Sequence, residues 1–249
     1  MGFHGADEDV SGRAGPTRPF RDGALAAPSA WGLFREPLGL LELPRLLLNA
    51  PSLATQPKSS GRPVVLLPGH GGGDASTTVL RMYLRYLGYD ARGWGLGTNK
   101  GDVPALIPKV AKLVAEVAAE TRQPVRLIGW SLGGYLAREA ARERPADVSR
   151  VITLGSPVIG GPKYTAVADA YRRQGYDLDA IEAAVADRER VALQVAVTAI
   201  YSKTDGVVAW RACIDSRNRN IEHVEVRTTH LGLGFAPDVY RVVAQRLAL

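Results

Sequence analysis

The sequence predicts an α/β fold, a mostly parallel sheet of about six strands with helices on both faces. Short apolar runs bounded by Gly or Pro alternate with longer segments of helical periodicity from about residue 62 to the C-terminus. The chain has 249 residues, of which 46% are hydrophobic and 22% charged, and this is enough for one sizeable core. No apolar stretch reaches the ~18 residues that a membrane span requires.

The elements can be justified in chain order. Residues 64–67 form an apolar run that ends at Pro68-Gly69, which is typical of a strand buried on both faces, and Asp74 is placed to cap a helix over about 75–87. Further strands are expected at 89–93, 125–129, 150–155, 195–202 and 224–227. Further helices are expected at 103–121 behind Asp102, at 132–144 before Pro145, and at 237–248 from Pro237.

The parts outside this alternation give the domain organisation. Residues 1–27 are rich in Gly, Pro and charge without periodicity, which predicts a flexible N-terminal arm. Residues 28–61 are a lead-in and linker, whose leucines predict one or two short amphipathic helical turns that pack on the domain or, alternatively, dock on lipid. The domain itself spans 62–249. About forty residues separate two of its strands, and the insertion over 158–190 is expected to cap a pocket.

Charge and cysteine content narrow the functional classes. The net charge is +6, but the arginines are scattered among acidic residues, as in 142–144, which indicates a solvated surface of mixed sign and no nucleic-acid partner. Cys213 is the single cysteine, and nothing near residue 1 resembles a secretory signal, so we expect a cytoplasmic protein. The Gly-rich runs 69–73 and 93–97 lack the spacing of nucleotide-binding motifs, and no Cys/His cluster has zinc-ligand spacing.

One motif of the sequence indicates a catalytic residue. In an open parallel sheet, reactive groups gather in the loops at the carboxyl ends of the strands. The strand over 125–129 runs into Gly129-Trp130-Ser131-Leu132-Gly133 and then into a helix, which is the strand–turn–helix context of a G-x-S-x-G nucleophile elbow. Glycines at 129 and 133 relieve crowding around the serine, and Gly134 lets the helix pack closely. Ser131 is therefore the candidate nucleophile.

A serine hydroxyl needs a base, and the base needs a carboxylate to orient it. In this architecture the three residues follow in the order Ser, Asp, His. Asp205 and His230 each come just after an apolar strand, whereas the alternative acid Asp215 lies beyond an expected helical turn. The other histidines are worse placed: His4 lies in the arm, His70 precedes the serine and His223 enters the last strand.

With these residues, the chain over about 62–249 resembles a serine hydrolase of the α/β-hydrolase superfamily, of the bacterial esterase and lipase type. The resemblance implies the α/β-hydrolase fold, catalytic roles for Ser131, Asp205 and His230, and no metal or cofactor. It also implies an oxyanion hole made by two backbone amides. One belongs to Leu132 and the other to His70, with Gly71 as the alternative to His70.

The expected activity is cleavage of small-molecule or lipid carboxylic esters through an acyl-enzyme, rising as His230 deprotonates with a pKa of roughly 6–7. An acyltransferase with the same triad and a non-catalytic lipid- or partner-binding protein are the alternatives. No feature of the sequence indicates an oligomeric state or a mobile lid. Residues near predicted strand ends are candidates to line the substrate pocket, with core packing as the alternative: Trp94, Trp130, Tyr135, Val207 and Trp210.

Overall fold

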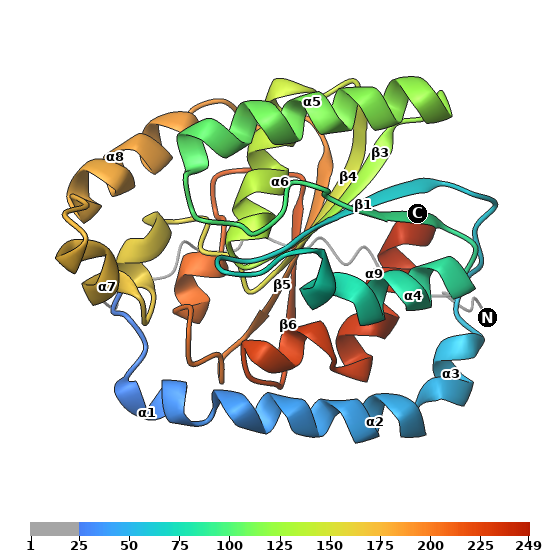
Figure 1. Cartoon of the computed structure of the whole chain (residues 1–249), viewed down its shortest axis with the longest axis horizontal. Coiled ribbons are helices and arrows are strands. Elements are labelled where there is room, and N and C mark those ends of the chain that lie inside the picture. Colours follow the sequence, from blue (N-terminus) through green and yellow to red (C-terminus); the bar gives the residue numbers. More distant parts are fainter. Residues whose placement is uncertain (1–24) are drawn as a thin grey trace, which may run out of the picture.

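The computed structural model describes residues 25–249, and they confirm the predicted α/β architecture. Six strands form one sheet in the order β2-β1-β3-β4-β5-β6, and every neighbouring pair is parallel (Figure 1). The strands are β1 (Pro63–Leu67), β2 (Asp90–Gly93), β3 (Val125–Trp130), β4 (Val148–Leu154), β5 (Ala196–Ser202) and β6 (Ile221–Val226). Most of the arm predicted over 1–27 lies outside the described residues.

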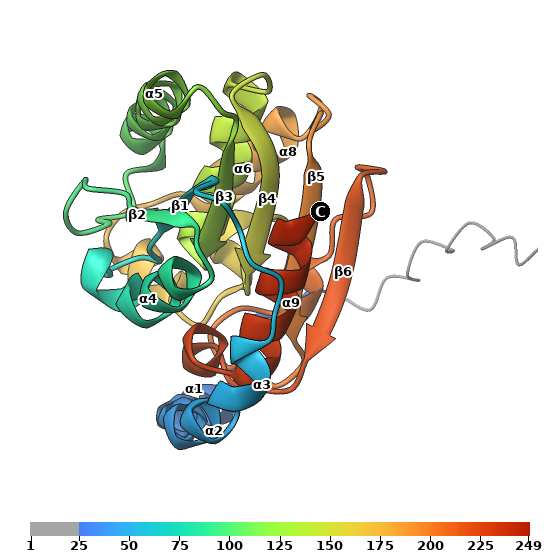
Figure 2. The same ribbon diagram turned by 90° about the vertical axis from the view of Figure 1, so that its right-hand side faces the viewer.

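Helices cover both faces of the sheet (Figure 2). On one face α4 (Thr78–Tyr86) and α9 (Pro237–Ala248) pack against Val64 and Leu66, and on the other α5 (Val103–Thr121) and α6 (Leu132–Glu143) pack against Val65 and Leu67. Successive side chains of a strand point to opposite faces, so β1 contributes side chains to the hydrophobic cores on both faces of the sheet. This is why its sequence is a continuous apolar run.

The helix starts were predicted with mixed success. Asp102 caps α5 as expected, because its Oδ1 accepts the N–H of Ala105 at 3.2 Å. The cap at Asp74 is wrong: Asp74 opens a 3-10 helix, η2 (Asp74–Thr77), and its carboxylate instead accepts the N–H groups of Trp94 at 2.9 Å and Gly95 at 3.1 Å. A Cβ on Gly93 would lie 2.3 Å from this carboxylate. Asp74 therefore ties the loop after β1 to the loop after β2.

The lead-in is more helical than predicted, with four short pieces: α1 (Ala30–Phe34), η1 (Glu36–Leu41), α2 (Glu42–Leu48) and α3 (Ala50–Ala54). They run along one edge of the molecule, beside α9 (Figure 1). Leu46 and Leu53 are buried in the core under α4 and α9, whereas Trp31 is 79% and Leu48 82% exposed. One face of the lead-in thus packs on the domain, and the other is apolar and open. Among residues 25–249, no helix is long and apolar enough to cross a membrane.

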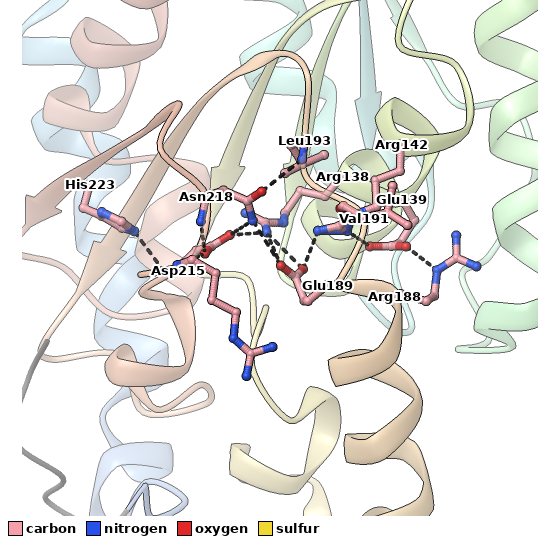
Figure 3. Close-up of polar contacts among 11 residues, drawn as sticks. Arg138, Glu139, Arg142, Arg188, Glu189, Val191, Leu193, Asp215, Asn218 and His223 are labelled. Atoms are coloured by element: carbon pink, nitrogen blue, oxygen red, sulfur yellow. Dashed lines mark hydrogen bonds and ion pairs between the residues drawn. The ribbon is translucent and has the colours of Figure 1, made fainter.

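The chain between β4 and β5 holds η3 (Gly161–Tyr164), α7 (Ala168–Arg173) and α8 (Leu178–Arg188). Buried ion pairs join the end of α8 to α6, the helix that starts directly after Ser131 (Figure 3). Arg138 on α6 contacts Glu189 at 3.0 Å, and Arg142 contacts the same carboxylate at 2.7 Å. Losing one partner would leave a buried charge uncompensated, so removal of either side of this contact should be strongly destabilising.

Candidate active site

The turn between β3 and α6 holds Ser131 with φ 54° and ψ −124°. Non-glycine residues rarely adopt a positive φ, and such strain costs on the order of 1–3 kcal/mol. Its neighbours explain the glycine spacing: a Cβ on Gly129 would lie 2.3 Å from the Cα of Gly134, and one on Gly133 would lie 2.2 Å from a carbonyl oxygen of β1. The turn is thus closed too tightly for a side chain at either of these two glycines, which lie two residues before and two after the serine.

Asp205 and His230 lie in the loops after β5 and β6, and their side chains meet. Oδ2 of Asp205 is 2.7 Å from Nδ1 of His230. The second oxygen, Oδ1, accepts the N–H groups of Val207 at 2.8 Å and Val208 at 2.7 Å. Because a carboxylate accepts, the imidazole carries its proton on Nδ1, and Nε2 keeps a lone pair that can take a proton.

Gly155, in the loop after β4, leaves room for this pair. Its φ is +56°, and a Cβ there would lie 2.9 Å from Oδ2 of Asp205 and 3.0 Å from Nδ1 of His230. Any larger residue would therefore collide with the hydrogen bond between the two side chains. The loops of three neighbouring strands together fix the acid and the base.

Several effects act on the pKa of His230. Burial lowers the pKa, because a low-dielectric site disfavours the charged imidazolium. The charge of Asp205, its hydrogen bond and the charge of Glu36 act in the opposite direction and outweigh burial. The net result is a pKa above the ordinary histidine value.

Ser131 and His230 open into the same cavity, which has a volume of about 800 Å³. Trp130, Tyr135 and Val207 line this cavity, together with His70 and Leu132. The insertion between β4 and β5 supplies a largely apolar wall: Val167, Tyr171, Tyr176, Ile181 and Val185. The serine, the histidine and this wall thus surround one space.

Two aromatic candidates do not reach the cavity, and for them the pocket prediction is wrong. Trp94 is 1% exposed and packs in the core under α5, where its indole N–H donates to the carbonyl of Gly97 at 2.9 Å. The ring of Trp210 stacks on Tyr201, with 5.8 Å between the ring centroids. Both were expected near strand ends, but their side chains pack against other residues and away from the cavity.

The two candidate oxyanion donors after β1 differ in their hydrogen bonds. The N–H of Gly71 donates to the carbonyl of Asn99 at 2.8 Å, so this amide is engaged within the loop. Asn99 is fully buried, and its side chain also donates to the carbonyl of Pro68 at 2.9 Å. The geometry therefore favours the amide of His70. Leu132 is the first residue of α6, where backbone N–H groups have no partner within the helix.

The other titratable residues considered for the site make contacts elsewhere in the fold. Asp215 contacts Arg138 at 2.5 Å, and although burial opposes ionisation, this guanidinium brings the pKa of Asp215 below its usual value. His223 accepts the N–H of Asp215 at 3.0 Å through Nε2. Burial raises the pKa of the Cys213 thiol. Within the described part of the chain, no group of three or more His, Cys, Asp and Glu residues is arranged to hold a metal ion.

Glu36 of the lead-in was missed by sequence reasoning. It is 7% exposed, and its carboxylate accepts backbone N–H groups from the loops of both Asp205 and His230. No motif surrounds it. The available signal was an acid between Arg35 and Pro37 in a leucine-rich stretch, which does not say where the carboxylate points.

With the fold and this geometry in hand, comparison with known proteins gives the family. The model of the alpha/beta hydrolase family matches residues 64–246. The chain belongs to the alpha/beta hydrolase family. The match includes all three of Ser131, Asp205 and His230, and it leaves the lead-in outside.

Curated relatives of this alpha/beta hydrolase include methyl ester esterases. It is 30% identical over 109 residues to a pimeloyl-[acyl-carrier protein] methyl ester esterase of Aliivibrio fischeri, and 31% identical over 109 residues to one of Aliivibrio salmonicida. Each alignment covers 42% of this chain and 40% of the relative, so the chain spans less than half the length of these curated relatives.

Solved structures share the fold at low sequence identity. A mature lipase of Bacillus licheniformis has a TM-score of 0.58 at 16% identity, covering 78% of this chain and 94% of that one. Aspergillus fumigatus lipase B has a TM-score of 0.55 at 19% identity, covering 76% of this chain and 53% of that one. At such identities the likeness concerns the fold alone.

Proposed function

We propose that this alpha/beta hydrolase cleaves carboxylic esters through an acyl-enzyme on Ser131. One observation carries the proposal: His230, hydrogen-bonded to Asp205, lines the same cavity as the strained serine. A base oriented by a carboxylate, beside a serine held on a sharp turn, is the arrangement that nucleophilic acyl transfer requires. The esterase relatives support the same reaction class.

In the proposed mechanism, Nε2 of His230 takes the Ser131 proton while Oγ attacks the ester carbonyl carbon. The amides of Leu132 and His70 donate to the oxygen that becomes negative. The imidazolium then protonates the leaving alcohol, and the acyl group stays on Oγ. Water repeats the sequence, losing its proton to the imidazole, and the carboxylic acid leaves. Asp205 holds the tautomer throughout.

The cavity supports esters with an apolar acyl or alcohol group, of a small molecule or of a lipid. Its volume of about 800 Å³ is in the upper part of the usual range for ligand pockets, roughly 300–1,000 Å³. Arg188 and Asp102 also line the cavity. The guanidinium of Arg188 is held by Glu139 and Glu143, and Oδ1 of Asp102 caps α5. An uncharged substrate therefore suits this wall.

The proposal includes a cytoplasmic location and no nucleic-acid partner. Cys213 is the single cysteine, so no disulfide within the chain calls for an oxidising compartment. Several basic side chains at the surface are paired with acids, as Arg246 is with Glu222 at 2.6 Å and Arg92 with Glu120 at 2.6 Å. Such a surface of mixed sign lacks the basic stripe of nucleic-acid binders.

The pH dependence of kcat/KM is the first expected result. The imidazole must be neutral to accept the serine proton, so activity rises as His230 loses its proton. Because Asp205 and Glu36 raise the pKa of His230 above its ordinary value, the midpoint of the acidic limb should lie above about 6.5. Measured rates between pH 5 and pH 9 would check this, and a midpoint well below 6 would contradict the site geometry.

Chain-length preference should respond to the wall of the cavity. Ile181 on α8 lines the cavity, so Ile181→Trp should fill space that a long acyl chain needs. We expect kcat/KM for long-chain esters to fall roughly 10–100-fold while acetyl esters are cleaved nearly as before. Ala183→Trp is the matched control, since Ala183 lies exposed on the same helix and outside the cavity lining. Equal losses for all chain lengths would place the substrate elsewhere.

The test of the function combines two measurements on the wild-type protein. Chromogenic esters of increasing chain length should be hydrolysed, and a serine-directed phosphonate should add once, with peptide mapping placing the adduct on Ser131. Labelling without hydrolysis, followed by ester formation when alcohols are added, would replace hydrolysis by acyl transfer. If the protein shows neither hydrolysis nor labelling, the function that remains is that of a non-catalytic binding protein on the hydrolase fold.

A further inference from the structure

The carboxylate of Glu36 lies between the loops that carry the acid and the base. Oε1 accepts the N–H of Gly206 at 2.7 Å and of His230 at 3.1 Å, and Oε2 accepts the N–H of Leu231 at 2.7 Å. Gly206 directly follows Asp205, and Leu231 directly follows His230. One side chain therefore holds the backbone on both sides of the Asp205–His230 hydrogen bond.

The lead-in backbone is shaped for this contact. A Cβ on Gly32 would lie 2.9 Å from the Cα of Gly206, and a Cβ on Gly39 would lie 2.5 Å from the nitrogen of Gly232. Glycines on both sides of Glu36 thus let the lead-in approach the two loops closely. The carbonyl of Glu36 also accepts the hydroxyl of Thr229 at 3.3 Å.

We propose that Glu36 is a positioning residue that sets the spacing between Asp205 and His230 by binding the backbone of both their loops. Its effect on turnover rests on the proposed function. Glu36 does not line the cavity, so it acts through the acid and the base without touching substrate. Hydrogen bonds from N–H groups to a carboxylate are about twice as strong as those between neutral groups, and three of them converge on this one.

The charge of Glu36 adds a second effect. The charged groups that act on the imidazole are Asp205, from the loop after β5, and Glu36, from η1, and both raise the pKa of His230 against the effect of burial. Both also favour the imidazolium that forms during acyl transfer. Removing the charge of Glu36 should therefore lower the pKa of His230.

Glu36→Gln tests the proposal, because it keeps the shape and removes the charge. One amide oxygen can still accept, but the NH₂ group then faces an N–H donor and leaves it unpaired. We expect kcat to fall on the order of 10–100-fold with KM little changed, and the acidic limb of kcat/KM to move to lower pH.

Two further variants separate positioning from general support of the lead-in. Glu42→Gln removes a carboxylate of the same segment, which accepts the hydroxyl of Thr228 at 2.8 Å and pairs with Arg45, and it should leave the acidic limb in place. Glu36→Asp keeps the charge but shortens the reach, so its acidic limb should stay near the wild-type position while kcat falls.

The deciding readout is the NMR titration of the His230 ring, which needs no substrate and is resolvable among four histidines. A lower titration midpoint in Glu36→Gln supports the proposal, and an unchanged midpoint with rates reduced equally at every pH overturns it. If Glu36→Gln does not fold, an undiminished kcat in Glu36→Asp overturns it instead. A wild type that neither hydrolyses esters nor reacts with phosphonate would refute the function, while the titration would still decide the role of Glu36.

Discussion

Replacing Ser131 by alanine is expected to lower ester turnover on the order of 10³-fold or more and to leave the fold intact. Without Oγ no acyl-enzyme can form, and what remains comes from substrate binding and the oxyanion donors. The backbone of the turn keeps its hydrogen bonds, from the N–H of Ser131 to Leu154 at 2.8 Å and from Gly134 to the carbonyl of Ser131 at 3.0 Å. Alanine also retains the Cβ, so the strain of the turn is unchanged.

The measurement is kcat on a chromogenic ester together with the urea midpoint of unfolding for both proteins. Matching midpoints would assign the loss of rate to chemistry. Phosphonate labelling should disappear in the same variant. Near-normal turnover with Ser131→Ala would rule out the proposed mechanism.

The second large effect is expected for Asp205→Asn. The N–H groups of Val207 and Val208 need an acceptor, so the amide oxygen of asparagine must take the position of Oδ1 and its NH₂ must face His230. Facing a donor, the imidazole presents its lone pair at Nδ1 and carries its proton on Nε2. In this tautomer it cannot take the serine proton, and the expected loss in kcat is on the order of 10⁴-fold.

Asp238→Asn is the control for this substitution, because Asp238 lies at the surface outside the cavity lining, where it pairs with Arg45 and Arg241. It should keep near-normal activity. A loss of less than about tenfold with Asp205→Asn would show that another group orients the base. Circular dichroism and thermal melting of both variants would verify that they fold alike.

The parts of this molecule that sequence predicts well are those that leave a pattern within a few residues of sequence. The apolar runs of the strands, the cap at Asp102 and the glycine spacing around Ser131 are such patterns, although Gly133 also packs against a carbonyl of β1. The meeting of serine, acid and base follows from the parallel sheet, whose strands end at one edge, whereas their order along the chain is a feature of the family. These features could be recognised without knowing any long-range contact.

The parts that sequence missed depend on contacts between distant segments. The carboxylate of Asp74 accepts the backbone N–H of Trp94, twenty residues onward, and no local signal distinguishes this contact from a helix cap. Trp94 itself follows a strand end, but its ring is buried in the hydrophobic core under α5. Glu36 meets its amide partners 170 to 195 residues later, and only the folded chain brings them together.

The position of the lead-in also bears on where the chain can be shortened. The family match begins at residue 64, so the obvious recombinant fragment would start at β1 and keep all six strands. That fragment would lack the carboxylate that accepts three backbone donors beside the acid and the base, and water in its place would not tie the two loops to each other. It would also uncover the side of α9 that Leu46 and Leu53 protect. For expression, swapping or directed evolution, the smallest useful unit of this protein therefore includes the lead-in as well as the sheet.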